Sequence, residues 1–227
     1  LAARRLSFGA ISAEQRTLVW DAFKASLEPL ATAGKLGVLV FQFPPWFEDD
    51  DGRQRYLAHL AENAAPYRVA VEFRNHTWLA DATAQRETLA LLRDAGLCYV
   101  AVDEPQGFES SVPPVMAATG PVAIVRLHGR NRGTWEHGGA TASDRFDYYY
   151  RREELAEWVP QAVDLADTGI EVHMSLNTNK GDQGPVNADL LVELLEERGA
   201  AEREPHAPPT GPQSGDKPPA PGQLTLF

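Results

Sequence analysis

The chain has 227 residues, 43% of them hydrophobic and 23% charged, proportions typical of one globular domain. A net charge of −11 argues against a general nucleic-acid coat protein, but it leaves room for a local basic pocket. The single cysteine excludes an intramolecular disulfide, and no apolar run approaches the ~20 residues needed to cross a bilayer. We therefore expect a cytoplasmic protein with no membrane partner.

Helical and strand-like segments alternate along the chain. Ser12 can cap a helix that continues to about Ala33, because its hydroxyl can accept a hydrogen bond from a free backbone N–H of the first turn. Further helices are predicted at residues 52–63, 81–95, 151–167 and 186–198, and Pro160 can kink or divide the third of these. Strand-like apolar runs lie at residues 38–43, 69–74, 98–103, 122–128 and 170–177. This alternation is typical of parallel strands joined by right-handed crossovers.

The strand-like runs end in polar or charged residues, with polar positions that alternate along each run. Because successive side chains of a strand point to opposite faces, we expect the polar positions to share one face. They are Gln42, Glu72, Arg74, Asp103, Arg126 and His128, with His173 and Asn177 in the last run. The apolar face, against helices, would hold Leu39, Phe41, Phe43, Val69, Val71, Phe73, Val100, Val102, Val125 and Leu127. Polar groups at the carboxyl ends of parallel strands are how a β/α barrel builds a site.

The predicted fold class is α/β, a partial TIM (β/α)8 barrel with about five parallel strands. Five strands do not close a barrel of eight, so we expect the first three strand–helix units, about 80 to 100 residues, to be missing. A first residue of Leu1 in place of Met is consistent with that expectation. We assign residues 1–199 to the partial barrel, residues 200–222 to a disordered Pro-rich linker, and residues 223–227 to a short terminal peptide.

Five segments resemble the YecE-like family of TIM-barrel proteins, also called domain of unknown function 72. They are FQFPPWF (41–47), VAVEFRNHTW (69–78), YVAVDEP (99–105), VAIVRLHGRNRGTW (122–135) and SLNTN (175–179). The resemblance covers roughly residues 30–197 and implies a complete barrel whose first strand is similar to Gly-Thr-Ser-Gly-Trp, which is absent here. The family tends to have Phe-Asn-Asn where this chain has Leu176-Asn177-Thr178. It has no established reaction, so the resemblance implies a fold and a site but no substrate.

Two strand ends pair an acid or an imidazole with an arginine. Glu72 and Arg74 form either an ion pair in a barrel mouth or a general acid or base beside an anion-holding guanidinium. Arg126 and His128 repeat the pattern, followed by residues 129–133 (GRNRG), which are either an anion-binding loop or an exposed turn. We predict catalytic roles for Glu72, Asp103 and His128. We predict substrate binding by Gln42, Arg74, Arg126, Arg130 and Asn177.

The sequence does not identify a cofactor, and a divalent metal ion is the one candidate that it offers. Glu72, Asp103, His128 and His173 offer carboxylate and imidazole ligands. No HExxH or paired-cysteine spacing supports a metal, and neighbouring arginines oppose a cation.

The last five residues carry a separate prediction. Gln223-Leu224-Thr225-Leu226-Phe227 resembles the peptide by which bacterial replication and repair proteins bind the sliding clamp, with Thr225 where Ser or Asp is usual. Gln223, Leu224, Leu226 and Phe227 would contact the clamp, and a flexible linker would raise their effective concentration. The alternative is an accidental apolar terminus.

The leading functional hypothesis is an enzyme acting on a phosphate-bearing substrate, either a phosphorylated small molecule or a nucleic acid, with phosphoester hydrolase or nuclease-like activity. One rival is a non-catalytic module that binds an anion or a nucleic-acid end. Another is a carbohydrate-active barrel that uses Glu72, Asp103 and the loop residues Trp78 and Trp135.

Overall fold

The computed structural model describes residues 12–136 and 141–200. Parallel strands form one sheet in chain order: β1 (Leu39–Gln42), β2 (Val69–Glu72), β3 (Cys98–Asp103), β4 (Val122–Leu127) and β5 (Glu171–Leu176). The helices are α1 (Ala13–Thr32), α2 (Asp51–Ala64), α3 (Ala82–Asp94), α4 (Arg152–Ala156), α5 (Val159–Asp167) and α6 (Gln183–Glu196). Single 3-10 turns lie at His76–Leu79 and Ala142–Phe146.

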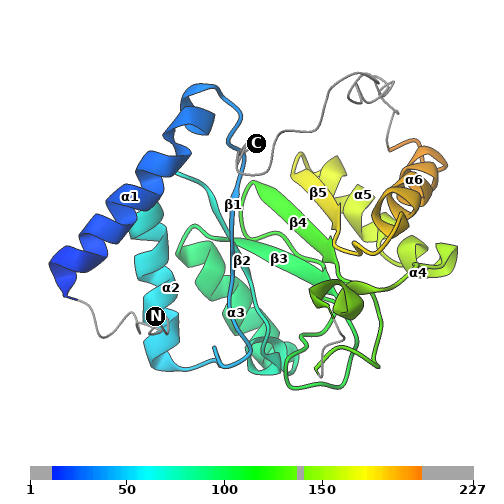
Figure 1. Cartoon of the computed structure of the whole chain (residues 1–227), viewed down its shortest axis with the longest axis horizontal. Coiled ribbons are helices and arrows are strands. Elements are labelled where there is room, and N and C mark those ends of the chain that lie inside the picture. Colours follow the sequence, from blue (N-terminus) through cyan, green and yellow to red (C-terminus); the bar gives the residue numbers. More distant parts are fainter. Residues whose placement is uncertain (1–11, 137–140, 201–227) are drawn as a thin grey trace, which may run out of the picture.

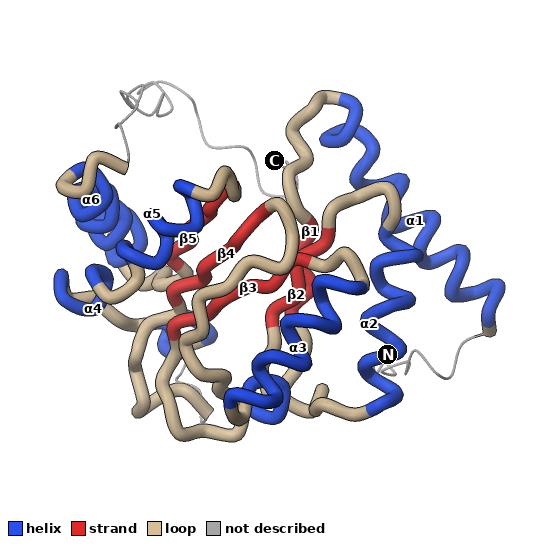
Figure 2. The backbone as a smooth tube through the Cα atoms, turned by 180° about the vertical axis from the view of Figure 1, so that it is seen from behind, coloured by secondary structure: helices blue, strands red, loops and turns tan. Residues whose placement is uncertain are grey.

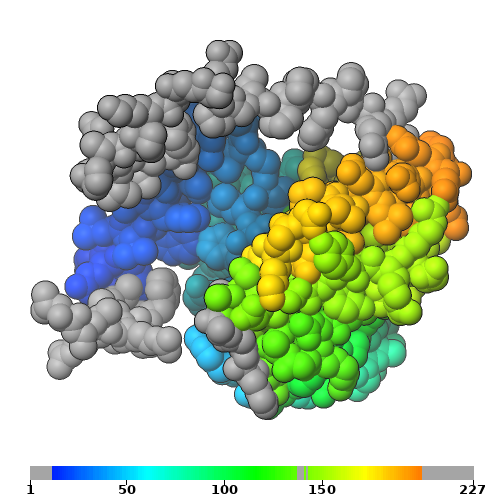
Figure 3. Space-filling view, turned by 45° about the vertical axis from the view of Figure 1, so that its right-hand side comes forward, coloured from blue at the N-terminus to red at the C-terminus, as the bar shows by residue number. Residues whose placement is uncertain are grey.

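The sheet is open, and its edge strands are β1 and β5. Helices from the first half of the chain lie near β1, and helices from the second half lie near β5. Helices α1 and α2 lie beside β1, and α5 and α6 lie beside β5 (Figures 1 and 2). In the space-filling view α1 and α6 occupy opposite sides of the molecule (Figure 3). The architecture is a partial TIM barrel with five parallel strands, as the sequence predicted. In the part of the chain that the structure describes, no helix combines the length and apolar character needed to span a membrane.

Local sequence signals explain most helix ends. The Ser12 hydroxyl accepts a hydrogen bond from the backbone N–H of Gln15, whose side chain accepts from the Ser12 N–H in return. Asp81 caps α3 by accepting from two backbone N–H groups of the first turn. Pro160 lies in the first turn of α5, so the helix predicted at residues 151–167 is two helices, α4 and α5.

An aromatic stack joins the loops that follow β1 and β2. The rings of Phe73 and Trp78 stack with centroids 4.3 Å apart, and those of Phe43 and Phe47 lie 4.0 Å apart. Trp78 is fully buried, and its indole Nε1–H donates to the Phe47 carbonyl over 2.7 Å. Trp78 is therefore a core residue that fixes two loops, and it does not face the barrel mouth.

The prediction of which residues of β3 face inward is wrong, because the alternation is shifted by one residue. The register places Val102 beside Arg126 and Asp103 beside Leu127, so Val102 shares the inner face and Asp103 shares the face that the helices cover. All six residues of β3 are buried. Because both faces of β3 are buried, the sequence does not show which alternate residues face inward, and the prediction that Val100 and Val102 face the helices is wrong.

Other predictions fall on residues that the structure does not describe. Residues 201–222 of the Pro-rich linker and the terminal peptide with Gln223, Leu224, Leu226 and Phe227 lie outside the described ranges.

Gly129 directs the chain from β4 into the next loop. Its φ of +87° lies in the region that favours glycine, and a Cβ there would lie 2.6 Å from the Tyr148 Cβ. Its backbone N–H donates to the Tyr150 hydroxyl over 2.8 Å. The close approach that requires this glycine is to the Tyr148 side chain.

The variant Gly129→Ala should therefore be less stable than a matched control. Gly169 has a φ of +86° but no atom within 4 Å of an added Cβ, so Gly169→Ala shares the backbone strain and lacks the clash. We expect Gly129→Ala to lose about 1–3 kcal/mol more than Gly169→Ala in the free energy of unfolding. Urea denaturation of both variants measures the difference, and equal losses would contradict the role of Tyr148.

Candidate functional site

A buried carboxylate, Glu72, lies at the centre of the polar cluster at the carboxyl ends of the strands. Its Oε1 accepts from Arg74 Nε over 2.7 Å and lies 3.1 Å from His128 Nε2, and its Oε2 accepts from Arg126 Nη1 over 2.5 Å. Burial raises the pKa of Glu72, but the hydrogen bond from His128 and the charges of Arg74 and Arg126 outweigh burial and bring the pKa to about 2. Glu72 is therefore an anion that holds two guanidiniums together, and it is a weak base.

A second buried carboxyl group, Glu104, also contacts Arg74. Its Oε2 accepts from Arg74 Nη1 over 2.7 Å, and its Oε1 accepts from the backbone N–H of Val112 over 2.8 Å. Burial raises the pKa of Glu104 to about 8, an effect larger than the lowering by the Arg74 charge. Glu104 was not predicted from the sequence, because the prediction places the alternate residues of β3 on the inner face. The signal was present in the Asp103-Glu104 pair at the strand end.

His128 and Asn177 complete the cluster. Asn177 Oδ1 accepts from Arg126 Nη2 over 3.2 Å, and its Nδ2 lies 3.0 Å from His128 Nδ1. With this amide orientation Nδ1 is the acceptor, so Nε2 carries the hydrogen that Glu72 accepts. Burial, with the charges of Arg74 and Arg126, lowers the pKa of His128 to about 4 although Glu72 opposes the shift. The imidazole is neutral near pH 7.

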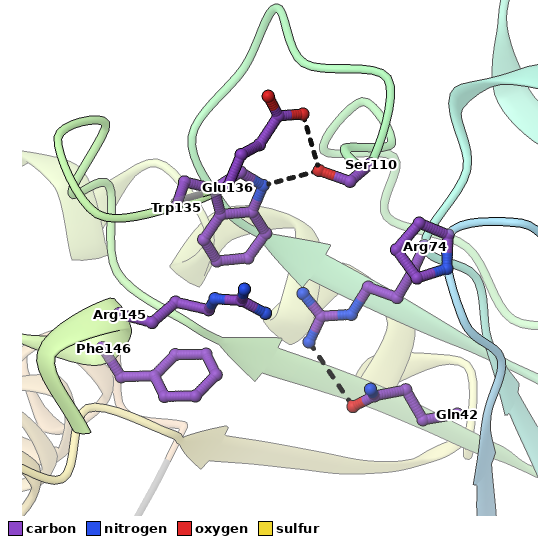
Figure 4. Close-up of a pocket in the computed structure, with 8 residues that line it drawn as sticks. Gln42, Arg74, Ser110, Trp135, Glu136, Arg145 and Phe146 are labelled. Carbon is purple, nitrogen blue, oxygen red and sulfur yellow. Dashed lines mark hydrogen bonds between the residues drawn. The ribbon is translucent and has the colours of Figure 1, made fainter. Parts of the chain in front are cut away.

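A pocket of about 290 Å³ lies against this cluster, lined by Gln42, Pro45, Arg74, Ser110, Trp135, Glu136, Arg145 and Phe146. The guanidiniums of Arg74 and Arg145 extend toward each other from opposite sides of the pocket (Figure 4). Their Cζ atoms lie 5.3 Å and 5.8 Å from the Trp135 ring centroid. Gln42 Oε1 contacts both inner arginines, at 3.2 Å from Arg126 Nη1 and 3.5 Å from Arg74 Nη2.

Arg145 was not predicted from the sequence. It is exposed and forms no ion pair within residues 12–136 and 141–200. Lys180 holds the 3-10 turn that carries Arg145, because its Nζ donates to Asp144 within the turn over 3.2 Å and to Asp147 just after it over 2.6 Å. Arg145 lies outside every strand, so strand alternation gave no signal for it.

Asp103 and Arg130 form a separate cluster on the helix-covered face. Asp103 accepts from Arg130 Nη2 over 2.6 Å, from Tyr150 over 2.9 Å and from the Trp158 indole over 2.8 Å. Arg130 also pairs with Glu157 over 2.7 Å. The expectation that Asp103 and Arg130 lie with Glu72 is therefore wrong, because the carboxylate of Asp103 points to the opposite face of the sheet. Its contacts tie β3 to the α4–α5 region.

The predicted anion-binding loop, residues 129–133, makes its contacts away from the pocket. Arg132 donates to the Gln106 carbonyl and stacks 4.9 Å from the Phe108 ring centroid. Both arginines of the predicted loop thus contact protein groups away from the pocket.

The metal ligands suggested by the sequence do not converge. His173 pairs with Glu171 over 2.9 Å, and Asp103 lies on the other face from Glu72 and His128. Among the described residues, no three His, Cys, Asp or Glu side chains are grouped so that they could hold a metal ion. The donor set around Glu72 is dominated by guanidiniums, which does not fit a cation.

Comparison with known proteins identifies the family of this chain. The profile described as "Protein of unknown function DUF72" matches residues 3–212. UPF0759 protein YunF of Bacillus subtilis is 34% identical over 192 residues, which cover 83% of this chain and 68% of the relative.

Solved structures agree with the fold. A DUF72 family protein of Thermotoga maritima is similar with a TM-score of 0.70 and 32% identity, over 78% of this chain and 64% of that one. A DUF72 family protein of Enterococcus faecalis is similar with a TM-score of 0.75 and 25% identity, over 85% of this chain and 70% of that one. This chain thus spans less than two thirds of the Thermotoga protein. The matches confirm the resemblance of the strand-end segments, and the chain belongs to the DUF72 family of proteins of unknown function.

Proposed function

We propose that the protein binds a phosphate-bearing molecule in the pocket beneath Trp135. The observation that carries this proposal is the approach of two guanidiniums, Arg74 and Arg145, from opposite sides of one pocket (Figure 4). Like charges repel, so this arrangement favours an anion between them, and arginine suits phosphate through paired N–H donors. Arg126 adds a third positive charge behind the pocket floor.

Removal of the positive charge of Arg145, at the rim of the pocket, tests the proposal. We expect Arg145→Ala to weaken binding of inorganic phosphate by about tenfold or more, because a charge-assisted hydrogen bond is lost. Isothermal titration calorimetry at low salt measures the dissociation constant. Arg93→Ala removes the same charge from an exposed position at the end of α3 and should leave binding unchanged. Equal affinities in wild type and Arg145→Ala would refute the assignment of the pocket.

Phosphoester hydrolysis is the second candidate, and one observation favours it. Three titratable groups behind Arg74 have displaced pKa values, about 2 for Glu72, about 4 for His128 and about 8 for Glu104. Such separation is typical of catalytic sites. Of the three, Glu104 alone titrates near neutral pH, and below about pH 8 it is uncharged, so the site keeps its positive charge.

Hydrolysis of phenyl phosphate should therefore depend on pH. As the pH rises through about 8, Glu104 ionises, cancels one positive charge and lowers kcat/KM. The substrate is already dianionic there, because the second pKa of phosphate esters is about 6. We expect Glu104→Gln to flatten the profile between pH 7 and 9, and Arg126→Ala to lower phosphate release by about tenfold or more. Wild-type protein that binds phosphate but releases none from phenyl phosphate would be a binding module.

The alternative of a carbohydrate-active barrel requires two carboxyl groups at one site, and Glu72 and Asp103 do not lie together. Glycosidases place two carboxyl groups on either side of the scissile bond. Glu72 and Asp103 face opposite sides of the sheet, and Glu72 is occupied by three donors. Nucleic acid stays among the candidate substrates, because its ends and backbone carry phosphate.

Recruitment to the bacterial sliding clamp is proposed for the last five residues, Gln223-Leu224-Thr225-Leu226-Phe227. The support is their sequence pattern, with apolar side chains that suit a hydrophobic pocket and a glutamine for polar contacts. The proposal also gives a reason for a cytoplasmic location and for a nucleic-acid substrate.

A pull-down with purified sliding clamp tests this recruitment. The chain of residues 1–227 should retain the clamp, and a chain that lacks residues 223–227 should not. Leu226→Ala with Phe227→Ala is the matched control, because it keeps the length and removes the apolar anchors. Equal retention by all three proteins would end the replication-linked proposal.

A further inference from the structure

The donors around the pocket are unequally engaged. Arg74 is held by protein groups on several sides: Nε donates to Glu72, Nη1 donates to Glu104, and Nη2 donates to Gln42 Oε1 over 3.5 Å. Arg145 donates no hydrogen bond to another group of the described part of the chain, and its Cζ lies 5.8 Å from the Trp135 ring centroid. The pocket therefore has one guanidinium fixed by protein groups and one, Arg145, that is free of hydrogen-bond partners among the described residues, and the two face each other (Figure 4).

The charge of the site exceeds that of a single anion. Arg74, Arg126 and Arg145 carry three positive charges, and Glu72 supplies one negative charge. Glu104 is largely uncharged near neutral pH because burial raises its pKa to about 8. Glu136 also lines the pocket, but its carboxylate turns to Ser110 Oγ, 3.3 Å away, on the far side of the Trp135 ring from the guanidiniums (Figure 4).

The number of hydrogen bonds that two cations on opposite sides can donate to one phosphate grows with the number of its free oxygens. A phosphate monoester has three terminal oxygens and a charge of about −1.5 to −2 near pH 7. A diester has two free oxygens and one negative charge, and its second carbon substituent would point toward one of the two guanidiniums. Both the oxygen count and the charge favour the monoester.

We infer that the pocket selects phosphate monoesters, meaning terminal phosphates, over phosphodiesters. This inference rests on the proposed function and specifies the substrate class of the same site. Arg74 holds one side of the phosphate in a fixed position, because Glu72 and Glu104 set its orientation. Arg145 contacts the opposite side and is the residue that discriminates, since a diester offers the two guanidiniums only two free oxygens and one negative charge, against three oxygens and about two charges in a monoester.

Two stable analogues test the selectivity without turnover. Phenylphosphonate has three terminal oxygens and represents the monoester, whereas its monomethyl ester has two and represents the diester. We expect wild-type protein at pH 7.5 and low salt to bind phenylphosphonate about tenfold or more tightly than the methyl ester, because one charge-assisted contact is lost. Isothermal titration calorimetry gives both dissociation constants.

The variant Arg145→Ala locates the discrimination. It should reduce the preference to about threefold or less, whereas Arg93→Ala should keep the wild-type preference. Circular dichroism checks that both variants are folded, and the comparison of the two analogues on wild type does not depend on any variant.

The possible results distinguish failure of monoester selection from failure of phosphate binding. Equal affinity of wild type for the two analogues overturns monoester selection and leaves phosphate binding in place. A full preference in Arg145→Ala also overturns the inference, because the free guanidinium would then not be the discriminating group. Binding of neither analogue, with no binding of inorganic phosphate, overturns the proposed function itself.

Discussion

The site depends on one buried carboxylate that two guanidiniums and an imidazole share. Glu72 has no exposed surface, and both of its oxygens accept hydrogen bonds from cationic or ring N–H donors. A buried charge is tolerated only when its partners are well placed, and loss of one partner from such a pair typically destabilises a protein by about 3–5 kcal/mol. The positions of Arg74 and Arg126 are thereby fixed from within the sheet, before any ligand arrives.

Consecutive residues at the end of β3 divide structural and site roles between two faces. Asp103 turns to the helices, where Arg130, Tyr150 and Trp158 donate to it. Glu104 turns to the inner face and contacts Arg74. Alternation along a strand makes this division automatic, because neighbours must point to opposite sides. The same strand end therefore anchors the α4–α5 region and orients an arginine of the pocket.

The rim of the pocket is positioned by a different kind of contact. Trp135, Arg145 and Phe146 come from the long connection between β4 and α4. Lys180, in the loop between β5 and α6, pairs with the two aspartates that flank Arg145 and Phe146. The floor is thus set by buried strand ends and the rim by exposed ion pairs, which are weaker and more sensitive to salt.

The sequence by itself determined the alternation of strands and helices, the parallel sheet, the family, and six members of the polar group. These are Gln42, Glu72, Arg74, Arg126, His128 and Asn177, which the structure brings together. They could be predicted because polar positions inside short apolar strands keep their face when the opposite face is plainly apolar. Their catalytic and binding roles stay predictions.

Only the tertiary structure decided where Asp103, Glu104, Arg130 and Arg145 lie. In β3 both faces are buried, so composition is the same on either side and the register against β4 alone fixes the inward set. Arg130 follows Asp103 to the helix face through their ion pair. Arg145 reaches the pocket from a connection whose path depends on contacts with a loop more than 30 residues later, at Lys180. Such long-range pairings leave no periodic trace in the sequence, because they depend on how distant segments meet in the folded chain.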